Sequence, residues 1–363
     1  MNFKPKSFHL QWHITERCNL NCSHCYQDPE LMSEEASFEN LVCILDNFVD
    51  LIKKWNLPKR AVRVSITGGE PLIRNNFFDF LEKVESYKEF FKYGILTNGV
   101  LINEEKLEKI KERNVDYLQI SIEGLKVTND KIRGDGVYEN IIETTDLIKN
   151  NSDIDLAYSL TASKNNLDEI PKVIKLADEK NVGLGIRRHV PYGRGKQMMQ
   201  DMLSPDQLRA LWHYIIKNNL NVHLGCEDDI LIQDLPEYRT AGCSAGYLSF
   251  TVMPNGDVYP CRRLPLFSGN LLKESFEDIY YNSEIMKKIR DLNNLNDVCG
   301  ECPNVDRCNG GAKCLSQGYF GDYSNPDPHC WRLFNELPDP DLKWRKTPQR
   351  KKINNKWVNF DES

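Results

Sequence analysis

Short β-rich runs alternate with longer segments of helical periodicity from residue 8 to about residue 220. This alternation is typical of βα units, because a strand that runs parallel to its neighbour needs a crossover connection, usually a helix. Six strands are expected, at residues 8–15, 63–67, 93–97, 117–122, 155–161 and 183–189. The helices between them are expected to open at Ser33 and then to cover residues 76–91, 103–113, 138–150, 167–180 and 205–218. The pattern predicts an α/β fold around a parallel sheet.

The character of the sequence changes after about residue 225. Helical patterns become rare, and eight of the twelve cysteines lie in this part, at positions 226, 243, 261, 299, 302, 308, 314 and 330. We expect a loop-rich second domain that is held together by something other than a large core. The predicted domains are therefore residues 1–222, residues 223–337 and a polar, basic, extended arm at 338–363.

Composition narrows the class of protein. The chain has 363 residues, of which 40% are hydrophobic and 28% charged, and its net charge is −6. It lacks an apolar run of about 20 residues and an N-terminal signal peptide, so we expect a cytoplasmic protein without a membrane role. The negative charge argues against a general nucleic-acid binder. In a reducing compartment, clustered cysteines indicate metal or redox chemistry and not disulfides.

Two motifs follow the first two predicted strands. Cys18, Cys22 and Cys25 are spaced x3 and x2, and three such thiolates can bind three irons of a cubane cluster and leave the fourth iron open. A zinc site would need a further protein ligand. The second motif is Gly68-Gly69-Glu70-Pro71, in which the glycines allow close approach to a ligand and the carboxylate can hold an ammonium group. Both motifs belong at the carboxyl edge of a parallel sheet, where ligands gather.

At these residues the chain resembles the radical S-adenosylmethionine enzymes. The resemblance implies a partial (β/α)6 barrel of the TIM type and a 4Fe-4S cluster on Cys18, Cys22 and Cys25 that binds S-adenosylmethionine. It also implies cofactor contacts from residues at several strand ends, namely His24, Gly68, Gly69, Glu70, Pro71, Thr97 and Ser121. A further motif of the family lies at the end of the fourth strand, where Ser121-Ile122-Glu123-Gly124 is followed by Asp130-Lys131-Ile132-Arg133-Gly134. Its usual form has Asp at the position of Glu123 and His at that of Asn129.

The later cysteines resemble the SPASM extension of radical enzymes that modify peptides and proteins. The resemblance implies two auxiliary 4Fe-4S clusters, the first on Cys243, Cys261 and Cys314. The ligands implied for the second cluster are Cys299, Cys302, Cys308 and Cys330. The first cluster lacks a fourth cysteine, because relatives that have one carry it where Ser249 stands. Either Cys226 completes that site or one iron is open, and Cys226 could equally be a buried apolar residue. Cys43 lies in an apolar helical pattern and is expected in the core.

The resulting hypothesis is an oxidoreductase that cleaves S-adenosylmethionine and modifies a peptide or protein side chain by hydrogen abstraction, giving a cross-link, a thioether or an epimer. The partners it implies are a peptide or protein substrate, a separate leader-binding protein and a flavodoxin or ferredoxin as electron donor. Two alternatives remain within catalysis: a sulfatase maturase, disfavoured because those enzymes tend to carry Gln where Thr67 stands, and a tetrapyrrole or small-metabolite enzyme. A non-catalytic zinc or electron-transfer protein is a third alternative.

Overall fold

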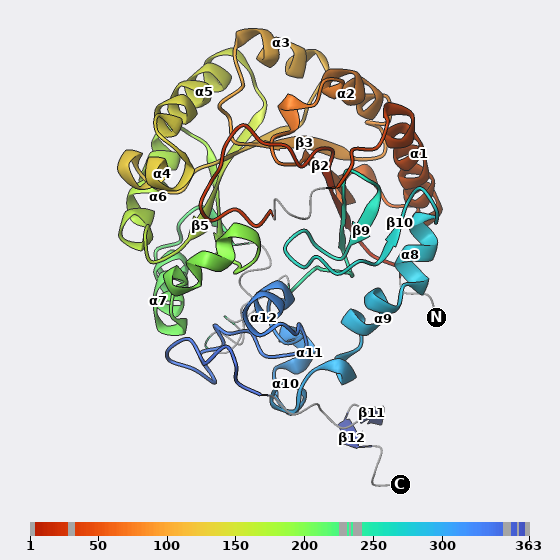
Figure 1. The fold of residues 1–363 in the computed structure, drawn as a ribbon, viewed down its shortest axis with the longest axis vertical. Coiled ribbons are helices and arrows are strands. Elements are labelled where there is room, and N and C mark those ends of the chain that lie inside the picture. The colour runs from red at the N-terminus through yellow and green to blue at the C-terminus, as the bar shows by residue number, and fades with distance from the viewer. Residues whose placement is uncertain are drawn as a thin grey trace.

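The six predicted strands all form, and they lie in chain order as one parallel sheet. This computed structural model describes residues 4–27, 33–224, 231, 234 and 242–343, and the backbone of 350–353 and 356–359. The strands are β1 (Phe8–His13), β2 (Val62–Thr67), β3 (Lys92–Thr97), β4 (Tyr117–Ser121), β5 (Asp155–Ala162) and β6 (Gly183–Arg188). The sheet curves into a barrel that is open on one side (Figure 1).

Helices cover the outside of the curved sheet (Figure 1). They are α1 (Phe38–Trp55), α2 (Phe77–Glu85), α3 (Glu104–Glu112), α4 (Lys126–Arg133), α5 (Val137–Asn151), α6 (Ile170–Glu179) and α7 (Pro205–Lys217). The prediction of a helix start at Ser33 is wrong, because Ser37 accepts a hydrogen bond from Asn40 N and caps α1, whereas Ser33 donates to Glu16. Helix α4 is absent from the prediction.

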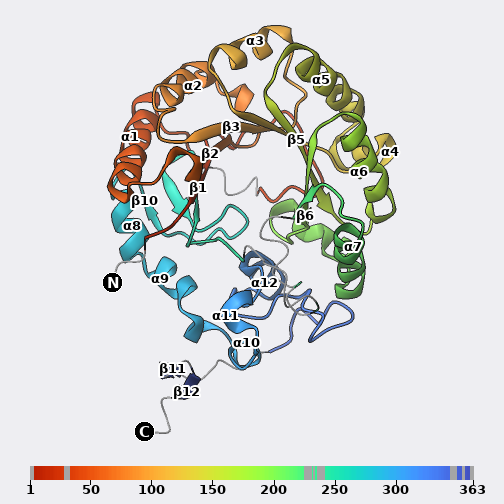
Figure 2. The ribbon, with the colours of Figure 1, turned by 180° about the vertical axis from the view of Figure 1, so that it is seen from behind.

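The sheet continues beyond the barrel at both edges. The short strand β7 (Val222–His223) pairs with β6, and β8 (Ser249–Val252) pairs in parallel with β1. Two antiparallel strands follow, β9 (Asp257–Tyr259) and β10 (Gly269–Asn270). The expected loop-rich part therefore begins by extending the barrel sheet past β1, and Figure 2 shows these strands beside α1 and α8 from the other side.

The rest of the later segment contains more helix than the sequence suggests. Its helices are short: α8 (Phe276–Asn282), α9 (Glu284–Arg290), α10 (Asp297–Gly300), α11 (Val305–Cys308) and α12 (Lys313–Phe320). Each spans only four to eight residues, too few for apolar periodicity to reveal them. In the tail, β11 (Arg350–Ile353) and β12 (Lys356–Asn359) pair as an antiparallel hairpin where an extended arm is expected.

The main core lies between the sheet and the helices and continues into the later segment. Phe8 of β1 packs edge-on against Trp55 of α1 and Phe250 of β8, with Tyr280 of α8 against the same rings. Cys43 is not part of this core; it is exposed, because Leu41, Ile44, Leu45 and Phe48 define the buried face of α1 and position 43 lies on the other side. The aromatic cluster joins the two predicted domains.

Candidate active site

The loop that carries Cys18, Cys22 and Cys25, here called the three-cysteine loop (residues 18–25), follows β1 and packs on the loop after β2. Gly69 N donates to Thr15 O at 2.9 Å, and Glu70 N donates to Arg17 O at 2.8 Å. A Cβ on Gly68 would lie 2.3 Å from Thr15 O, and one on Gly69 would lie 2.2 Å from Arg17 O. The two glycines are thus required for close contact between the two loops.

Glu70 braces the β2 loop against the end of β3. The residue is fully buried, and its carboxylate accepts hydrogen bonds from the Thr97 hydroxyl at 2.8 Å, from Asn98 N at 2.8 Å and from Leu72 N at 3.3 Å. Burial raises the pKa of Glu70 to about 7, and these hydrogen bonds oppose the rise. Thr97 in turn accepts from Gly99 N, so its hydroxyl is also engaged within the protein.

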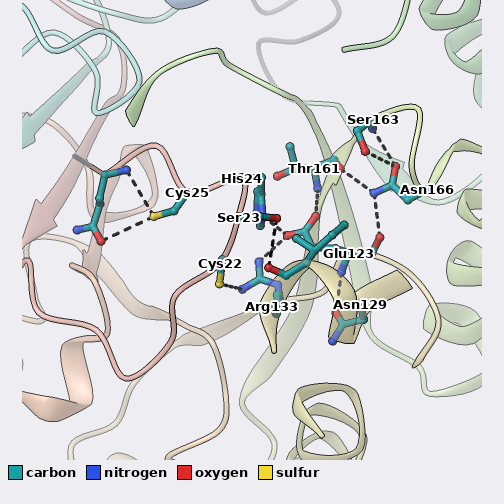
Figure 3. A network of polar contacts seen from close by, with 12 residues as sticks. Cys22, Ser23, His24, Cys25, Glu123, Asn129, Arg133, Thr161, Ser163 and Asn166 are labelled. Carbon is teal, nitrogen blue, oxygen red and sulfur yellow. Dashed lines mark hydrogen bonds and ion pairs between the residues drawn. The ribbon is translucent and has the colours of Figure 1, made fainter. Parts of the chain in front are cut away.

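His24 links the three-cysteine loop to a buried polar network (Figure 3). Its Nε2 lies 3.1 Å from Oε1 of Glu123, which follows β4. The same carboxylate pairs with Arg133 at the end of α4 and accepts from Thr161 N at 2.8 Å. Arg133 then donates to the Cys22 sulfur at 3.9 Å. The network therefore connects a thiol of the loop to the side chain that precedes the third cysteine.

Electrostatics keeps Glu123 ionised in this network. Burial by itself would raise the pKa of Glu123, but the charges of His24 and Arg133 outweigh it and lower the pKa to about 2. Asn129, the other departure from the usual family motif, accepts from Glu123 N at 3.0 Å. Glu123 and Asn129, which differ from the usual family residues, are thus hydrogen-bonded to each other in this chain.

A segment after β6 holds the opposite side of the three-cysteine loop. Gly195 N donates to Cys25 O at 3.0 Å, and Arg194 Nε donates to Cys22 O at 3.1 Å. A Cβ on Gly193 would lie 2.5 Å from Gln27 O, so this glycine too permits contact between two backbones. His189 Nε2 lies 2.8 Å from Gly195 O, so this side chain also supports the segment.

One cavity of about 920 Å³ connects most of the predicted site residues. Those that line it are Cys18, Cys22, His24, Cys25, Gly68, Gly69, Thr97, Ser121 and Cys261. Glu70 and Pro71 are not among its lining residues; Pro71 begins a single 3-10 turn directly behind the loop. Cys261 comes from the later segment, so the cavity is built from both predicted domains.

The residues on this cavity fit an iron-sulfur cluster with S-adenosylmethionine. Burial raises the pKa of the Cys18 thiol, and the Cys22 and Cys25 thiols lie near enough to raise it further. His24 Nδ1, Gln27 Nε2 and Arg133 Nε are buried without a hydrogen-bond partner among the described residues, as donors to a bound group would be. Nowhere in the described chain do three His, Cys, Asp or Glu side chains converge on the position of a single metal ion. A cubane cluster does not require this, because each of its irons takes one thiolate.

Four later cysteines surround a second cavity, of about 320 Å³. They are Cys299, Cys302, Cys308 and Cys330. Burial, together with the neighbouring Cys330 and Cys302 thiols, raises the pKa of Cys299 to about 12. This is the set that the family resemblance implies for the second auxiliary cluster, and four thiols on one cavity fit the complete ligand set of a 4Fe-4S cluster.

The remaining predicted ligands, Cys243, Cys261 and Cys314, belong to one smaller core. Cys314 on α12 is buried there, and Cys243 and Cys261 pack against it. Cys226, the suggested fourth ligand, lies outside the described residues. Ser249, at the alternative position, has its hydroxyl 3.0 Å from the Ser244 hydroxyl, and both residues line the barrel cavity.

Sequence reasoning missed the polar groups that support these sites. Glu123 and Arg133 lie in a recognised motif, yet ten residues separate them and their contact depends on α4. Arg188 and Asp327 form a buried ion pair at 2.8 Å that joins β6 to the segment before Cys330. No local pattern marks a pair 139 residues apart.

Comparison with known proteins agrees with this geometry. Residues 12–177 match the radical SAM superfamily, and residues 243–303 match the SPASM iron-sulfur cluster-binding domain. The chain is 30% identical to an AdoMet-dependent heme synthase of Methanosarcina barkeri, over 88% of this chain and 95% of the relative. It is 26% identical to the mycofactocin maturase MftC of Mycolicibacterium smegmatis, over 88% of this chain and 82% of the relative.

A solved structure shares the fold. Streptococcus suis SuiB bound to S-adenosylmethionine superposes with a TM-score of 0.71 at 20% identity, covering 90% of this chain and 77% of SuiB. The chain belongs to the radical SAM superfamily and carries a SPASM domain. It is an enzyme whose cofactors are S-adenosylmethionine and iron-sulfur clusters. No helix of the described chain is both long and apolar enough to cross a membrane.

Proposed function

We propose that this enzyme abstracts a hydrogen atom from a substrate that is bound in the barrel cavity, between the three-cysteine loop and Cys261. The observation that supports the proposal is the cavity itself, because one space of about 920 Å³ is lined by the three thiols and by a cysteine of the later segment. Bound there, a 4Fe-4S cluster and S-adenosylmethionine supply one-electron cleavage of the cofactor and hydrogen-atom abstraction. The protein positions both and excludes water.

The residues have distinct proposed roles. Cys18, Cys22 and Cys25 hold the radical-generating cluster, while His24, Gly68, Gly69, Thr97 and Ser121 are the candidate contacts for S-adenosylmethionine on the cavity wall. Glu70 and Pro71, which the resemblance implies as cofactor contacts, stay candidates for that role, and the Glu70 carboxylate also accepts hydrogen bonds from the Thr97 hydroxyl and from Asn98 N. The auxiliary clusters are proposed on Cys299, Cys302, Cys308 and Cys330 and on Cys243, Cys261 and Cys314. Cys226 remains a candidate for the fourth ligand of the latter.

A peptide or protein side chain is the first candidate substrate. Its support is the similarity to the mycofactocin maturase along 88% of this chain. In this function, a separate leader-binding protein would present the peptide, and a flavodoxin or ferredoxin in the cytoplasm would supply electrons. The proposed boundaries at residues 222 and 337 then separate the barrel, the SPASM domain and the basic arm.

A carboxylate-rich tetrapyrrole is the second candidate, because the cavity is unusually rich in arginine. Two acidic residues, Glu123 and Asp155, line it. Its basic lining residues are more numerous: Arg60, Arg63, Arg133, Arg187, Arg188, Arg194, Arg262 and Arg263. Several of these arginines pair with carboxylates of the protein, namely Glu123, Asp327 and Glu16. Arginine binds carboxylates in bidentate pairs, and a relative at 30% identity is a heme synthase.

Iron counting tests the cluster assignments. Three 4Fe-4S clusters correspond to about twelve irons per chain. We expect Cys22→Ala and Cys302→Ala each to lose about four irons after anaerobic reconstitution, and Cys43→Ala, at an exposed position away from both cavities, to lose none. A variant that keeps all its iron would remove that cysteine from the proposed ligands.

Turnover with defined substrates separates the two candidates. The enzyme would be reduced with S-adenosylmethionine and either iron coproporphyrin III or candidate precursor peptides, and 5′-deoxyadenosine and products would be followed by mass spectrometry. A mass change in the peptide supports the first candidate, and a mass change in the porphyrin supports the second. If neither substrate changes while cofactor is cleaved, both assignments fail.

A further inference from the structure

Arg262 lies between the two cysteine-bearing loops of the barrel cavity. It directly follows Cys261, and only 4% of its surface is exposed. Its guanidinium lies 5.2 Å from the centre of the Tyr26 ring, and Tyr26 directly follows Cys25. Its Nη2 lies 3.4 Å from Oε1 of Glu16, two residues before Cys18. One side chain from the later segment thus contacts both ends of the three-cysteine loop.

Both contact points are firmly held. Glu16 is 6% exposed, and its second carboxylate oxygen accepts from Ser33 N at 2.6 Å and from the Ser33 hydroxyl at 3.0 Å. Burial raises the pKa of Tyr26, the charge of Arg262 opposes the rise, and the Cys25 and Cys261 thiols add to it. Tyr26 therefore lies within electrostatic range of one thiol from each loop, and Arg262 lies over its ring.

The charge of Arg262 also matters, because thiolate-bound clusters are anionic. A buried positive charge stabilises the reduced form of a nearby cluster, which carries one more negative charge. The Arg262 Nη2 forms a buried ion pair with Glu16 at 3.4 Å. The Nε of Arg262 is buried without a hydrogen-bond partner among the described residues, and Arg262 itself lines the cavity.

We infer that Arg262 is a positioning residue: it fixes the separation between the three-cysteine loop and the Cys261 loop, and its charge raises the reduction potential of the clusters on both. This inference rests on the proposed function, since it requires clusters at Cys18, Cys22 and Cys25 and at Cys261. It separates two properties of the side chain, the planar fork that bridges the loops and the positive charge.

Three variants test these two properties. In Arg262→Gln the charge is lost; in Arg262→Lys the charge stays but the fork is lost; in Tyr26→Leu the charge stays but the stacking ring is lost. The matched control is Arg209→Gln, because Arg209 also lies over an aromatic ring, that of Trp331 at 6.0 Å, and pairs with Asp234, but on α7 and away from the cavity. Each variant is reconstituted as the full chain, and its iron content is measured first.

Two spectroscopic readouts then decide the outcome. Redox titration followed by electron paramagnetic resonance should show more negative midpoint potentials in Arg262→Gln, and potentials near wild type in Arg262→Lys, Tyr26→Leu and Arg209→Gln. Pulsed measurements of the coupling between reduced clusters should broaden the distance distribution in all three cavity variants and not in the control. With full iron in every variant, unchanged potentials and distances in Arg262→Gln overturn the inference. If Cys261→Ala instead retains all its iron, it is the proposed cluster site that fails.

Discussion

At the scale of single residues, one buried carboxylate organises the surroundings of the three-cysteine loop. Glu123 is 1% exposed and contacts His24, Arg133 and Thr161 N. An ion pair removed from water stabilises a structure only while both partners and their hydrogen bonds are present. The longer Glu side chain, where the family usually has Asp, thus has a defined place in this protein.

We expect Glu123→Gln to lower the free energy of unfolding by about 3–5 kcal/mol at pH 7, because it leaves the buried Arg133 charge without its partner. Chemical denaturation under anaerobic conditions measures the change. The exposed pair of Lys126 and Glu139 supplies the control, and Glu139→Gln should cost no more than about 1 kcal/mol. Equal costs for the two variants would contradict this role of Glu123.

The pH dependence of the same variant has a definite sign. The pKa of Glu123 is lowered from 4.5 to about 2, so its ionised form stabilises the folded state above pH 4.5, and that contribution is lost as the pH falls toward 2. The difference in unfolding free energy between wild type and Glu123→Gln should therefore shrink as the pH falls below 4.5. A difference that stays constant down to pH 3 would show that charge is not its origin.

At the scale of elements, the site depends on loops that follow β1, β2 and β6 and touch through their backbones. Gly69 meets the carbonyl of Arg17, and Gly195 meets the carbonyl of His24, where a Cβ would lie 2.9 Å away. Backbone atoms cannot move aside as a flexible side chain can, so these glycines fix how closely the loops approach the three-cysteine loop.

We expect Gly69→Ala to displace the three-cysteine loop and to lower the iron bound there by at least half, because its new Cβ would lie 2.2 Å from Arg17 O. Iron analysis and the spectrum of the reduced protein measure the loss. Gly183→Ala is the control, since its nearest neighbour would be the Ala157 methyl group at 3.3 Å. Full iron in Gly69→Ala would mean that the loop tolerates the shift.

At the scale of the whole molecule, the two predicted domains share one sheet and one aromatic core, and buried ion pairs join them. β8 pairs with β1, and Asp327 pairs with Arg188 of β6 while accepting from Ala312 N at 3.0 Å. The charge of Arg188 and the hydrogen bonds from His329 and Ala312 hold the pKa of Asp327 well below its usual range, against the effect of burial. The segment around Asp327 is thereby fixed to β6, and the pair lies between the two cavities, because Arg188 lines the first and Asp327 lines the second.

We expect Asp327→Asn to loosen this junction and to destabilise the protein by about 3–5 kcal/mol. Hydrogen exchange followed by mass spectrometry should rise both in β6 and in residues 311–330. The matched control is Asp322→Asn in the same loop, where the carboxylate accepts a hydrogen bond from Ser324 N at 2.9 Å. An exchange increase confined to residues 311–330 would contradict the coupling between this segment and β6.

The six strands and the three-cysteine loop follow from local signals, and so they are predicted correctly. The predicted start of α1 is wrong because Ser37 caps the helix, and the predicted burial of Cys43 is wrong because position 43 lies on the side of α1 away from Leu41, Ile44 and Phe48. Glu70 is a different case: its cofactor contact stays a prediction, and only the folded chain shows that its carboxylate accepts hydrogen bonds from the Thr97 hydroxyl and from Asn98 N.

The sequence by itself determined the chemistry, because thiol spacing on one loop and the order of strands are local properties that survive in any conformation of the rest. The family resemblance also implied a set of cysteine ligands for each cluster, and these sets stay predictions. Only the tertiary structure decided which residues meet across long separations: Glu123 with His24, Arg188 with Asp327, and Arg262 with Tyr26 and Glu16. These contacts exist because the sheet brings β1, β4, β6 and β8 to one cavity, and no local pattern records that convergence.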